Sequence, residues 1–346
     1  MTNEGRKHMN SVNWDRVNEE LANCDKRAVA GLYGLPNLGS PARSVYYDGV
    51  VSPPWEIPEE IVVQVAITGD FIRRDDNPNQ PYSSEEVLAE AQTVARAGAS
   101  AVHIHVRNEM GHGVLEKDRF EAVVRPLRDE FPDLHVDGCL VPFYDGEYDA
   151  MVELIEDKLF DGCPINPTAA FEGDTLFAKP PALLLDKTRR LVETNQFAPI
   201  GIYTDGDIAN ADRWLFRSGL LKSGQTWGIL PALPGCTPML NARQMFEGLL
   251  RNVAAIKDVD PEAKIMVCSS GRASSYVVTA AALLGLHIRV GMEDTMWRWP
   301  HREDLVQSNL QAFEQAKLIA QVTGRTIASP ARARELMGVP GAVTPV

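Results

Sequence analysis

From residue 60 onward the sequence alternates short β-branched segments with longer amphipathic segments, and this alternation limits the folds available to the chain. It is typical of βα units, in which helices cover a buried parallel sheet. Strands are predicted at residues 61–69, 101–106, 134–141, 159–166, 200–203, 225–230, 264–268 and 287–290. Eight units in roughly 270 residues indicate a (β/α)₈ TIM barrel. A doubly wound sheet is the competing architecture, but no G-x-G-x-x-G motif follows the first strand.

Helix signals fall between these strands. Ser84 is predicted as an N-cap, with Glu85 and Glu86 in the first turn of a helix that ends at Gly98. Further helices are predicted over residues 118–130, 181–195 and 241–256, from near Arg272, and over 304–323.

Residues 1–58 differ from the rest and are predicted to form an N-terminal arm, followed by a catalytic domain over 59–346. The arm holds one helical candidate, residues 12–24, and a Gly/Pro-rich stretch that begins at Gly31. We expect it to wrap the domain or a neighbouring subunit, and a disordered leader is the alternative. Its possible anchors are aromatic: Trp14, Tyr33, Tyr46, Tyr47 and Trp55.

Composition narrows the function classes. The net charge of -13, without a clustered basic stripe, argues against nucleic acid and anionic membranes as partners. Five cysteines without C-x-x-C spacing indicate reduced thiols rather than a disulfide framework. No uncharged apolar run approaches the roughly 20 residues of a membrane span, and the first residues lack a signal-peptide pattern. We therefore expect a soluble, cytoplasmic protein.

Two histidines mark the second predicted strand. His103 and His105 lie two residues apart, so both side chains point to one face of the strand, and that face is the barrel interior. Active sites of TIM barrels lie at the carboxyl ends of the strands. Two inward imidazoles at a strand end form half of a metal site, although a single strand histidine is more often a hydrogen-bonded core residue.

The third ligand is expected from the end of the eighth strand. Glu293 follows that strand, and strands one, two and eight are neighbours in a closed barrel, so Glu293 can meet His103 and His105. Two histidines and one glutamate leave an open position, which is typical of a catalytic rather than a structural zinc site.

Other charged residues follow the last two strands. Arg289 can clamp a substrate carboxylate or orient Asp294, and a structural ion pair is the alternative. Asp294 is the candidate general base, and its alternative role is a helix N-cap. Arg272 begins a helix where barrels often bind phosphate, so it can hold a cofactor phosphate or be a surface arginine. Cys139 ends the third strand, but no paired histidine argues for a nucleophile.

These residues resemble the β-keto acid cleavage enzyme family. The likeness covers about residues 60–338 and is most specific in His103-Ile-His-Val-Arg107 and in Arg289-Val-Gly-Met-Glu-Asp294. It also includes Ile67-Thr-Gly69, Asp118-Arg-Phe120 and Ser308-Asn309, and the segments 76–86, 97–102 and 323–333.

The resemblance implies a zinc-bearing barrel that condenses a β-keto acid with acetyl-CoA, giving acetoacetate and a new acyl-CoA. It also implies that His103, His105 and Glu293 bind zinc and that Arg289 and Asp294 generate the enolate. Thr168 matches a substrate-contacting threonine of the family. Family members tend to be homotetramers, and an arm that contacts other subunits fits an oligomer.

The sequence departs from the family where substrate is recognised. Phe71, with Asp70 before it, stands where members that take amino-substituted acids carry Glu. Residues 139–142 replace a Ser-Thr-Gly-Gly run, and the segment from Tyr203 lacks the usual Glu run. We therefore predict a changed substrate, with Asp70, Thr168 and Arg272 as candidate contacts. A metal-dependent aldolase, lyase or hydrolase without CoA and a non-catalytic keto acid or metal sensor remain as alternatives.

Overall fold

The computed structural model describes residues 12–23, 53–172 and 175–341, and it divides the chain into two units between Glu56 and Ile57. In the first unit, helix α1 (Trp14–Asn23) occupies most of the predicted helical segment 12–24. The side chains of Trp14 and Trp55 are exposed. Tyr33, Tyr46 and Tyr47, and the Gly/Pro-rich stretch, lie outside the described residues. The role of the arm and its boundary at residue 58 therefore stay predictions.

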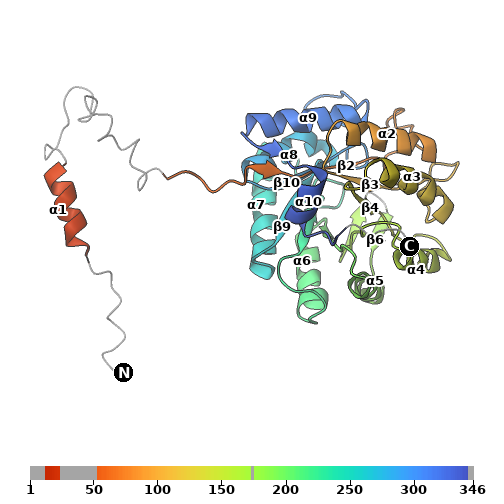
Figure 1. Ribbon diagram of the computed structural model, residues 1–346, viewed down its shortest axis with the longest axis horizontal. Helices are drawn as coiled ribbons and strands as arrows, with labels where there is room; N and C mark the ends of the chain where they lie inside the picture. The colour runs from red at the N-terminus through yellow and green to blue at the C-terminus, as the bar shows by residue number, and fades with distance from the viewer. Residues whose placement is uncertain (1–11, 24–52, 173–174, 342–346) are drawn as a thin grey trace. The chain divides into compact units, whose positions relative to one another are not determined.

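The second unit is built on a parallel sheet of seven strands in the order β4-β3-β2-β10-β9-β8-β7 (Figure 1). The strands run β2 (Val63–Ala66), β3 (Ala101–Ile104), β4 (His135–Gly138), β7 (Ile200–Ile202), β8 (Thr226–Ile229), β9 (Lys264–Cys268) and β10 (His287–Val290). The first and the last of these strands along the chain, β2 and β10, pair with each other, so the sheet curls instead of staying open. This pairing excludes the doubly wound alternative.

The chain between β4 and β7 lies where the eighth strand of the barrel would be, and this place is called the eighth position below. Residues 159–166 were expected to be a regular strand, and the structure shows isolated bridges instead: Gly162 with Asp137 and Phe197, and Ile165 with Ile200. The amides of Cys163 and Ile165 donate to the carbonyls of Phe197 (3.1 Å) and Pro199 (2.9 Å). Pro164 cannot donate to a ladder, which accounts for the irregularity. The segment still joins both edges of the sheet and completes the barrel.

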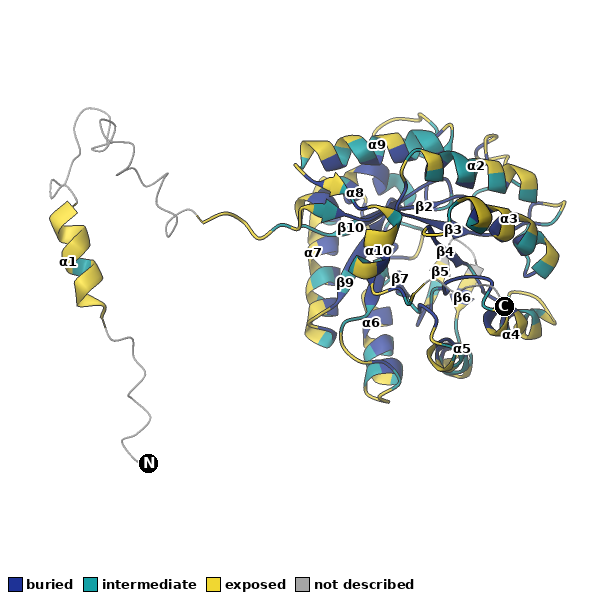
Figure 2. Ribbon diagram, in the orientation of Figure 1, coloured by how far each residue is buried: buried dark blue, intermediate teal, exposed yellow. Residues whose placement is uncertain are grey.

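Helices cover the outside of the sheet. They are α2 (Ser84–Arg96), α3 (Lys117–Glu130), α4 (Glu147–Glu156), α5 (Pro181–Glu193), α6 (Asp205–Ala211), α7 (Ala242–Val259), α8 (Ser274–Leu283) and α9 (Asn309–Val322). Their inner faces are buried against the strands and their outer faces are exposed (Figure 2). The main apolar core therefore lies between strands and helices, and the barrel interior also holds polar side chains, among them Gln64, His103 and Asp137.

Some boundaries and elements differ from the sequence predictions. Ser83, not Ser84, caps α2, in a capping box with Glu86. Helix α9 begins at Asn309 instead of near residue 304, because the Ser308 hydroxyl accepts the Gln311 amide and caps it there. Helices α4 and α6 and the hairpin of β5 (Ala169–Glu172) and β6 (Thr175–Ala178) were not predicted. No helix among the described residues is long and apolar enough to span a bilayer.

Three short elements close the amino end of the barrel. Strands β1 (Glu60–Ile61) and β11 (Thr326–Ile327) pair in parallel, and α10 (Pro330–Met337) follows β11. From α10, Arg334 reaches the buried carboxylate of Asp161 at 2.9 Å, and this carboxylate also contacts His135 at 3.1 Å. Burial alone would raise the pKa of Asp161, but His135, Arg334 and Arg128 hold it well below its usual range. The C-terminal segment thus fixes the irregular eighth position.

The eighth position gives a stability test at Gly162. A Cβ atom at this residue would lie 1.8 Å from the carbonyl oxygen of Phe197, so Gly162→Ala must push the two segments apart. We expect the free energy of unfolding to fall by about 1–3 kcal/mol, measured by urea denaturation. Gly206→Ala is the control, because its Cβ would lie 3.4 Å from the nearest atom, the Thr204 hydroxyl, at a helical position. Equal effects of the two changes would contradict this account of barrel closure.

Candidate active site

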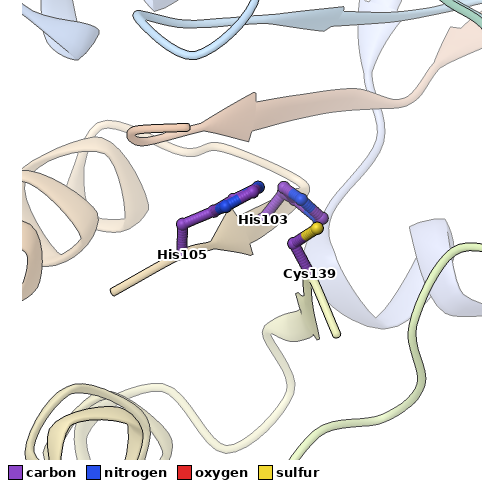
Figure 3. A group of neighbouring side chains, drawn as sticks. All are labelled: His103, His105 and Cys139. Carbon is purple, nitrogen blue, oxygen red and sulfur yellow. The ribbon is translucent and has the colours of Figure 1, made fainter. Parts of the chain in front are cut away.

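The barrel interior holds a cavity of about 970 Å³, part of it open to solvent, whose lining includes the carboxyl ends of the strands and also residues at their amino ends. Its lining includes Asp70, His103, His105, Arg289 and Glu293, so the structure brings five of the predicted site residues to one place. Strand β3 carries His103, and His105 follows one residue after its end. Both imidazoles turn into the barrel, as the two-residue spacing predicts (Figure 3).

His103 is held between two carboxylates. Its Nδ1 lies 2.8 Å from Oδ1 of Asp137 on β4, and its Nε2 lies 3.6 Å from Oε2 of Glu293. Asp137 Oδ1 also accepts a hydrogen bond from Gln64 at 3.1 Å, which fixes the carboxylate. Burial alone would lower the pKa of His103, but Glu293 and Asp137 outweigh it and raise the pKa to about 9. A carboxylate on Nδ1 orients the ring with Nε2 toward Glu293.

His105 repeats this arrangement with another partner. Its Nδ1 lies 3.3 Å from Oδ2 of Asp70, and its Nε2 lies 3.3 Å from Oε1 of Glu293. Burial opposes protonation here too, but Cys139, Glu293 and Asp70 raise the pKa of His105 well above its ordinary value. Both Nε2 atoms therefore face one carboxylate, and each ring has a second carboxylate behind it.

Glu293 belongs to a buried network with Arg289. The Arg289 guanidinium donates to both oxygens of Asp294, at 2.8 and 2.7 Å, and also to Glu293. Burial alone would raise the pKa of Glu293, but Arg289 and the two histidines hold it well below the usual range. Burial raises the pKa of Asp294 despite Arg289. Glu293 is thus an anion that faces the histidines, and Asp294 lies on the far side of the guanidinium.

The chemistry of this donor set fits a divalent cation. His105 Nε2 and Glu293 Oε2 are buried without a hydrogen-bond partner, which is costly unless another group satisfies them. Ligands about 2.0–2.2 Å from a tetrahedral zinc lie about 3.3–3.6 Å from one another. The separations of 3.3 and 3.6 Å between the Nε2 atoms and Glu293 are in that range. His103, His105 and Glu293 are therefore close enough to share one cation, and their role as its ligands stays a prediction.

Cys139 also lies at this site, and sequence reasoning had not given it a role. Donor atoms of Cys139, His103 and His105 lie within 4.8 Å of one another, and the three side chains face together (Figure 3). Burial alone would raise the pKa of the Cys139 thiol, but His105 and His103 lower it to about 6. The thiol is thus a second candidate for a third donor. Its position one residue past β4 was the available signal.

The remaining predicted contacts are placed differently. Asp70 lines the cavity beside His105. Thr168 is buried, donates to Asp207 (2.8 Å) and is not among the described residues that line the cavity. Arg272 is half-buried, pairs with Glu303 and stacks on Trp297, with its guanidinium carbon 3.5 Å from the ring centroid. It lines a separate groove with residues of the loop before α7.

The Arg289 network gives a second stability test. Arg289→Met leaves the Asp294 carboxylate buried without its cation, and we expect the free energy of unfolding to fall by about 3–5 kcal/mol. Arg272→Met is the matched control, because its ion pair with Glu303 is exposed and should contribute less than about 1 kcal/mol. Urea denaturation of both variants measures the difference. A loss at Arg289 no larger than at Arg272 would show that the buried network does not stabilise the fold.

Several known proteins are similar to this chain in sequence and in fold. The model of the β-keto acid cleavage enzyme family matches residues 60–339. The 3-keto-5-aminohexanoate cleavage enzyme of Acetoanaerobium sticklandii is 25% identical, over 81% of this chain and 99% of that protein. The 3-oxoadipate:acetyl-CoA acetyltransferase of Cupriavidus necator is 27% identical, over 81% of this chain and 95% of that protein.

A solved structure agrees with the fold. The complex of ObcA with oxaloacetate aligns with a TM-score of 0.62 and 18% identity, over 76% of this chain and 68% of that chain. This likeness supports the TIM-barrel architecture, and the family match covers the barrel from its first strand to the C-terminal helix. The chain therefore belongs to the β-keto acid cleavage enzyme family.

Proposed function

We propose that this protein is a zinc-dependent enzyme that condenses a β-keto acid with acetyl-CoA, giving acetoacetate and a new acyl-CoA. Family membership supports the keto acid, and relatives named as acetyl-CoA acetyltransferase and acetyl-CoA trimethylamine transferase support acetyl-CoA as co-substrate. The observation that carries the proposal is the convergence of two buried Nε2 atoms on Glu293 at the mouth of the barrel.

His103, His105 and Glu293 would hold the metal, with Asp137 and Asp70 orienting the two rings through their Nδ1 atoms. A zinc ion bound there would supply Lewis acidity, which polarises a keto oxygen and favours the enolate over the keto form. Arg289, which lines the same cavity, donates hydrogen bonds to Glu293 and Asp294 and would offset the negative charge of Glu293 beside the substrate.

The pair of Arg289 and Asp294 would remove the substrate proton. Arg289 faces the cavity and shares two hydrogen bonds with Asp294. One guanidinium proton passes to Asp294 as Arg289 takes a proton from C2 of the keto acid, so the pair stores the proton and C2 becomes a carbanion. Asp294 thus acts through Arg289, because it does not itself line the cavity among the described residues.

The remaining steps exchange two acyl groups. The C2 carbanion attacks the thioester carbon of acetyl-CoA, a C–C bond forms, and the CoA thiolate leaves. That thiolate attacks the original keto carbon, the bond between C2 and C3 breaks, and the new acyl-CoA departs. The carbanion left on C2 takes back the proton from the Arg289–Asp294 pair, which gives acetoacetate and restores the pair.

The proposal also assigns the predicted substrate contacts. The groove beside Arg272 lies between the loop before α7 and helix α8, and it includes Cys236, which packs in one apolar cluster with Tyr203 of the main cavity. Arg272 is therefore the candidate contact for a phosphate of acetyl-CoA. Asp70 remains a candidate contact inside the cavity, and Thr168 would support the hairpin, since its carbonyl accepts the Lys179 amide.

Location and assembly are also part of the proposal. Cys139, Cys163 and Cys268 are free thiols, which fits a reducing compartment such as the cytoplasm. A homo-oligomer, with four subunits as in the family, remains the expected assembly.

Metal content tests the donor set. We expect about one zinc per chain in the purified protein, loss of that zinc in His105→Ala and Glu293→Gln, and its retention in Cys139→Ser. Elemental analysis after dialysis measures this. Zinc retained by Glu293→Gln but lost from Cys139→Ser would replace Glu293 by Cys139 in the donor set.

The same preparations test the reaction. Acetoacetate should form from a β-keto acid only when acetyl-CoA is present, and a chelator should abolish it until zinc is restored. Turnover without acetyl-CoA would assign the protein to an aldolase, lyase or hydrolase instead. Binding of keto acid without any product would assign it to a sensor.

A substitution tests the proton transfer. Asp294→Asn should lower kcat by at least about 100-fold, because the amide cannot accept the proton passed through Arg289, while the zinc content stays unchanged. Asp304→Asn, at an exposed carboxylate, is the control and should keep full activity. Wild-type turnover in Asp294→Asn would remove Asp294 from the mechanism.

A further inference from the structure

One side of the main cavity is a wall of four aromatic rings, Phe71, Phe143, Phe177 and Tyr203. Phe177 is at its centre, with ring centroids 6.3 Å from Phe71, 6.1 Å from Phe143 and 5.6 Å from Tyr203. Phe177 and Tyr203 are buried, whereas the side chains of Phe71 and Phe143 are 49% and 46% exposed. The wall thus extends from inside the cavity to its rim, where apolar rings still face water.

The charged groups of the cavity lie away from this wall. Among the described lining residues, the charged groups around Glu293 are already paired with one another: His103 with Asp137, His105 with Asp70, and Arg289 with Glu293. His135 is paired with Asp161. Next to the wall, the lining continues with Val141 and Leu230, which pack in one apolar cluster with Phe177 and Tyr203. A charged group placed there would lose water without gaining a counter-ion from these lining residues. Lys179, whose ammonium lies 4.3 Å from the ring centroid of Phe177, is not among the described residues that line the cavity.

An aromatic wall can also bind a cationic ligand, and two observations disfavour that here. The ammonium of Lys179 already lies 4.3 Å from the ring centroid of Phe177 and 5.3 Å from that of Phe143, so a second cation would meet its charge. The nearby acidic residue, Asp70, directs Oδ2 to His105. A Cβ atom at Gly113 would lie 1.6 Å from Asp70 Oδ1, so this oxygen, which is buried and has no hydrogen-bond partner, packs against the Gly113 backbone.

We propose that the aromatic wall binds the chain attached to the keto carbon and selects β-keto acids whose chain is uncharged and apolar. This inference rests on the proposed function and adds the class of substrate. Apolar surface on the wall is covered when such a chain binds, and each buried methylene should raise kcat/KM by about fourfold until the wall is filled.

The hairpin that carries Phe177 supplies a matched control. Phe177 pairs with Ala170, and the next pair, Phe171 with Leu176, points to the opposite face of the hairpin. Phe171 is 62% exposed and lies outside the cavity lining. Substitutions at Phe177 and Phe171 therefore change the same residue type on the same hairpin, and only Phe177 belongs to the wall.

Three six-carbon substrates test the selectivity of the wild-type holoenzyme. 3-Oxohexanoate, 3-keto-5-aminohexanoate and 3-oxoadipate share one backbone and differ by a neutral, a cationic and an anionic substituent. With acetyl-CoA present, kcat/KM should be at least about tenfold higher for 3-oxohexanoate than for either charged substrate. A higher value for either charged substrate would overturn the proposal. No turnover of any keto acid would instead reject the proposed function.

Variants of the wall test its role with chains of different length. Phe177→Ala should lower kcat/KM for 3-oxooctanoate by about tenfold or more and for 3-oxopentanoate by less than about threefold, because the shorter chain reaches less of the wall. Phe177→Leu should recover most of the loss, and Phe171→Ala should match wild type. Equal losses on both chain lengths, or none at all, would show that Phe177 does not determine specificity. Zinc content of each variant checks that the metal site is intact.

Discussion

The site depends on the contact between Glu293 and the two histidines of β3, which the parallel register makes possible. Val290 of β10 aligns with Val65 of β2, and the next residue of β2, Ala66, aligns with His103. The chain leaves β10 through Gly291, whose φ of +134° is open to glycine and whose Cβ would meet the Ala66 carbonyl at 2.1 Å. It then crosses the end of β2 toward the histidines.

Gly69, in the loop after β2, also leaves room for the chain that crosses the end of β2. A Cβ atom there would lie 2.3 Å from Cγ of Glu293, so a side chain would occupy the path of the carboxylate. The two glycines therefore let a loop after the last strand approach the first strand closely enough to reach the second. Closure of the barrel therefore also brings Glu293 to the two histidines.

The sequence predicted site residues best where they lie on one strand with the two-residue spacing of a β-strand. The two-residue spacing of His103 and His105 predicted that both side chains face the barrel interior. The closure of a (β/α)₈ barrel then predicted that Glu293, after the last strand, lies close to them. Asp137 could not be assigned in this way, because its contact with His103 depends on the register between β3 and β4, and a one-residue slip would reverse its direction. The aromatic wall escaped prediction because Phe177 comes from a hairpin inserted before α5, in a segment without βα periodicity.

The cavity has a charged region around His103 and His105 and an apolar region at the aromatic wall. Around His103 and His105, the buried charged groups are paired with one another: Asp137 and Asp70 with the histidines, and Glu293 and Asp294 with Arg289. Such a network contributes little net stability, since desolvation offsets much of the attraction, so its retention is better explained by chemistry than by folding. On the aromatic wall the opposite holds, because apolar surface at the rim gains free energy only when something apolar covers it. A molecule with a polar keto acid end and an apolar chain satisfies both regions at once.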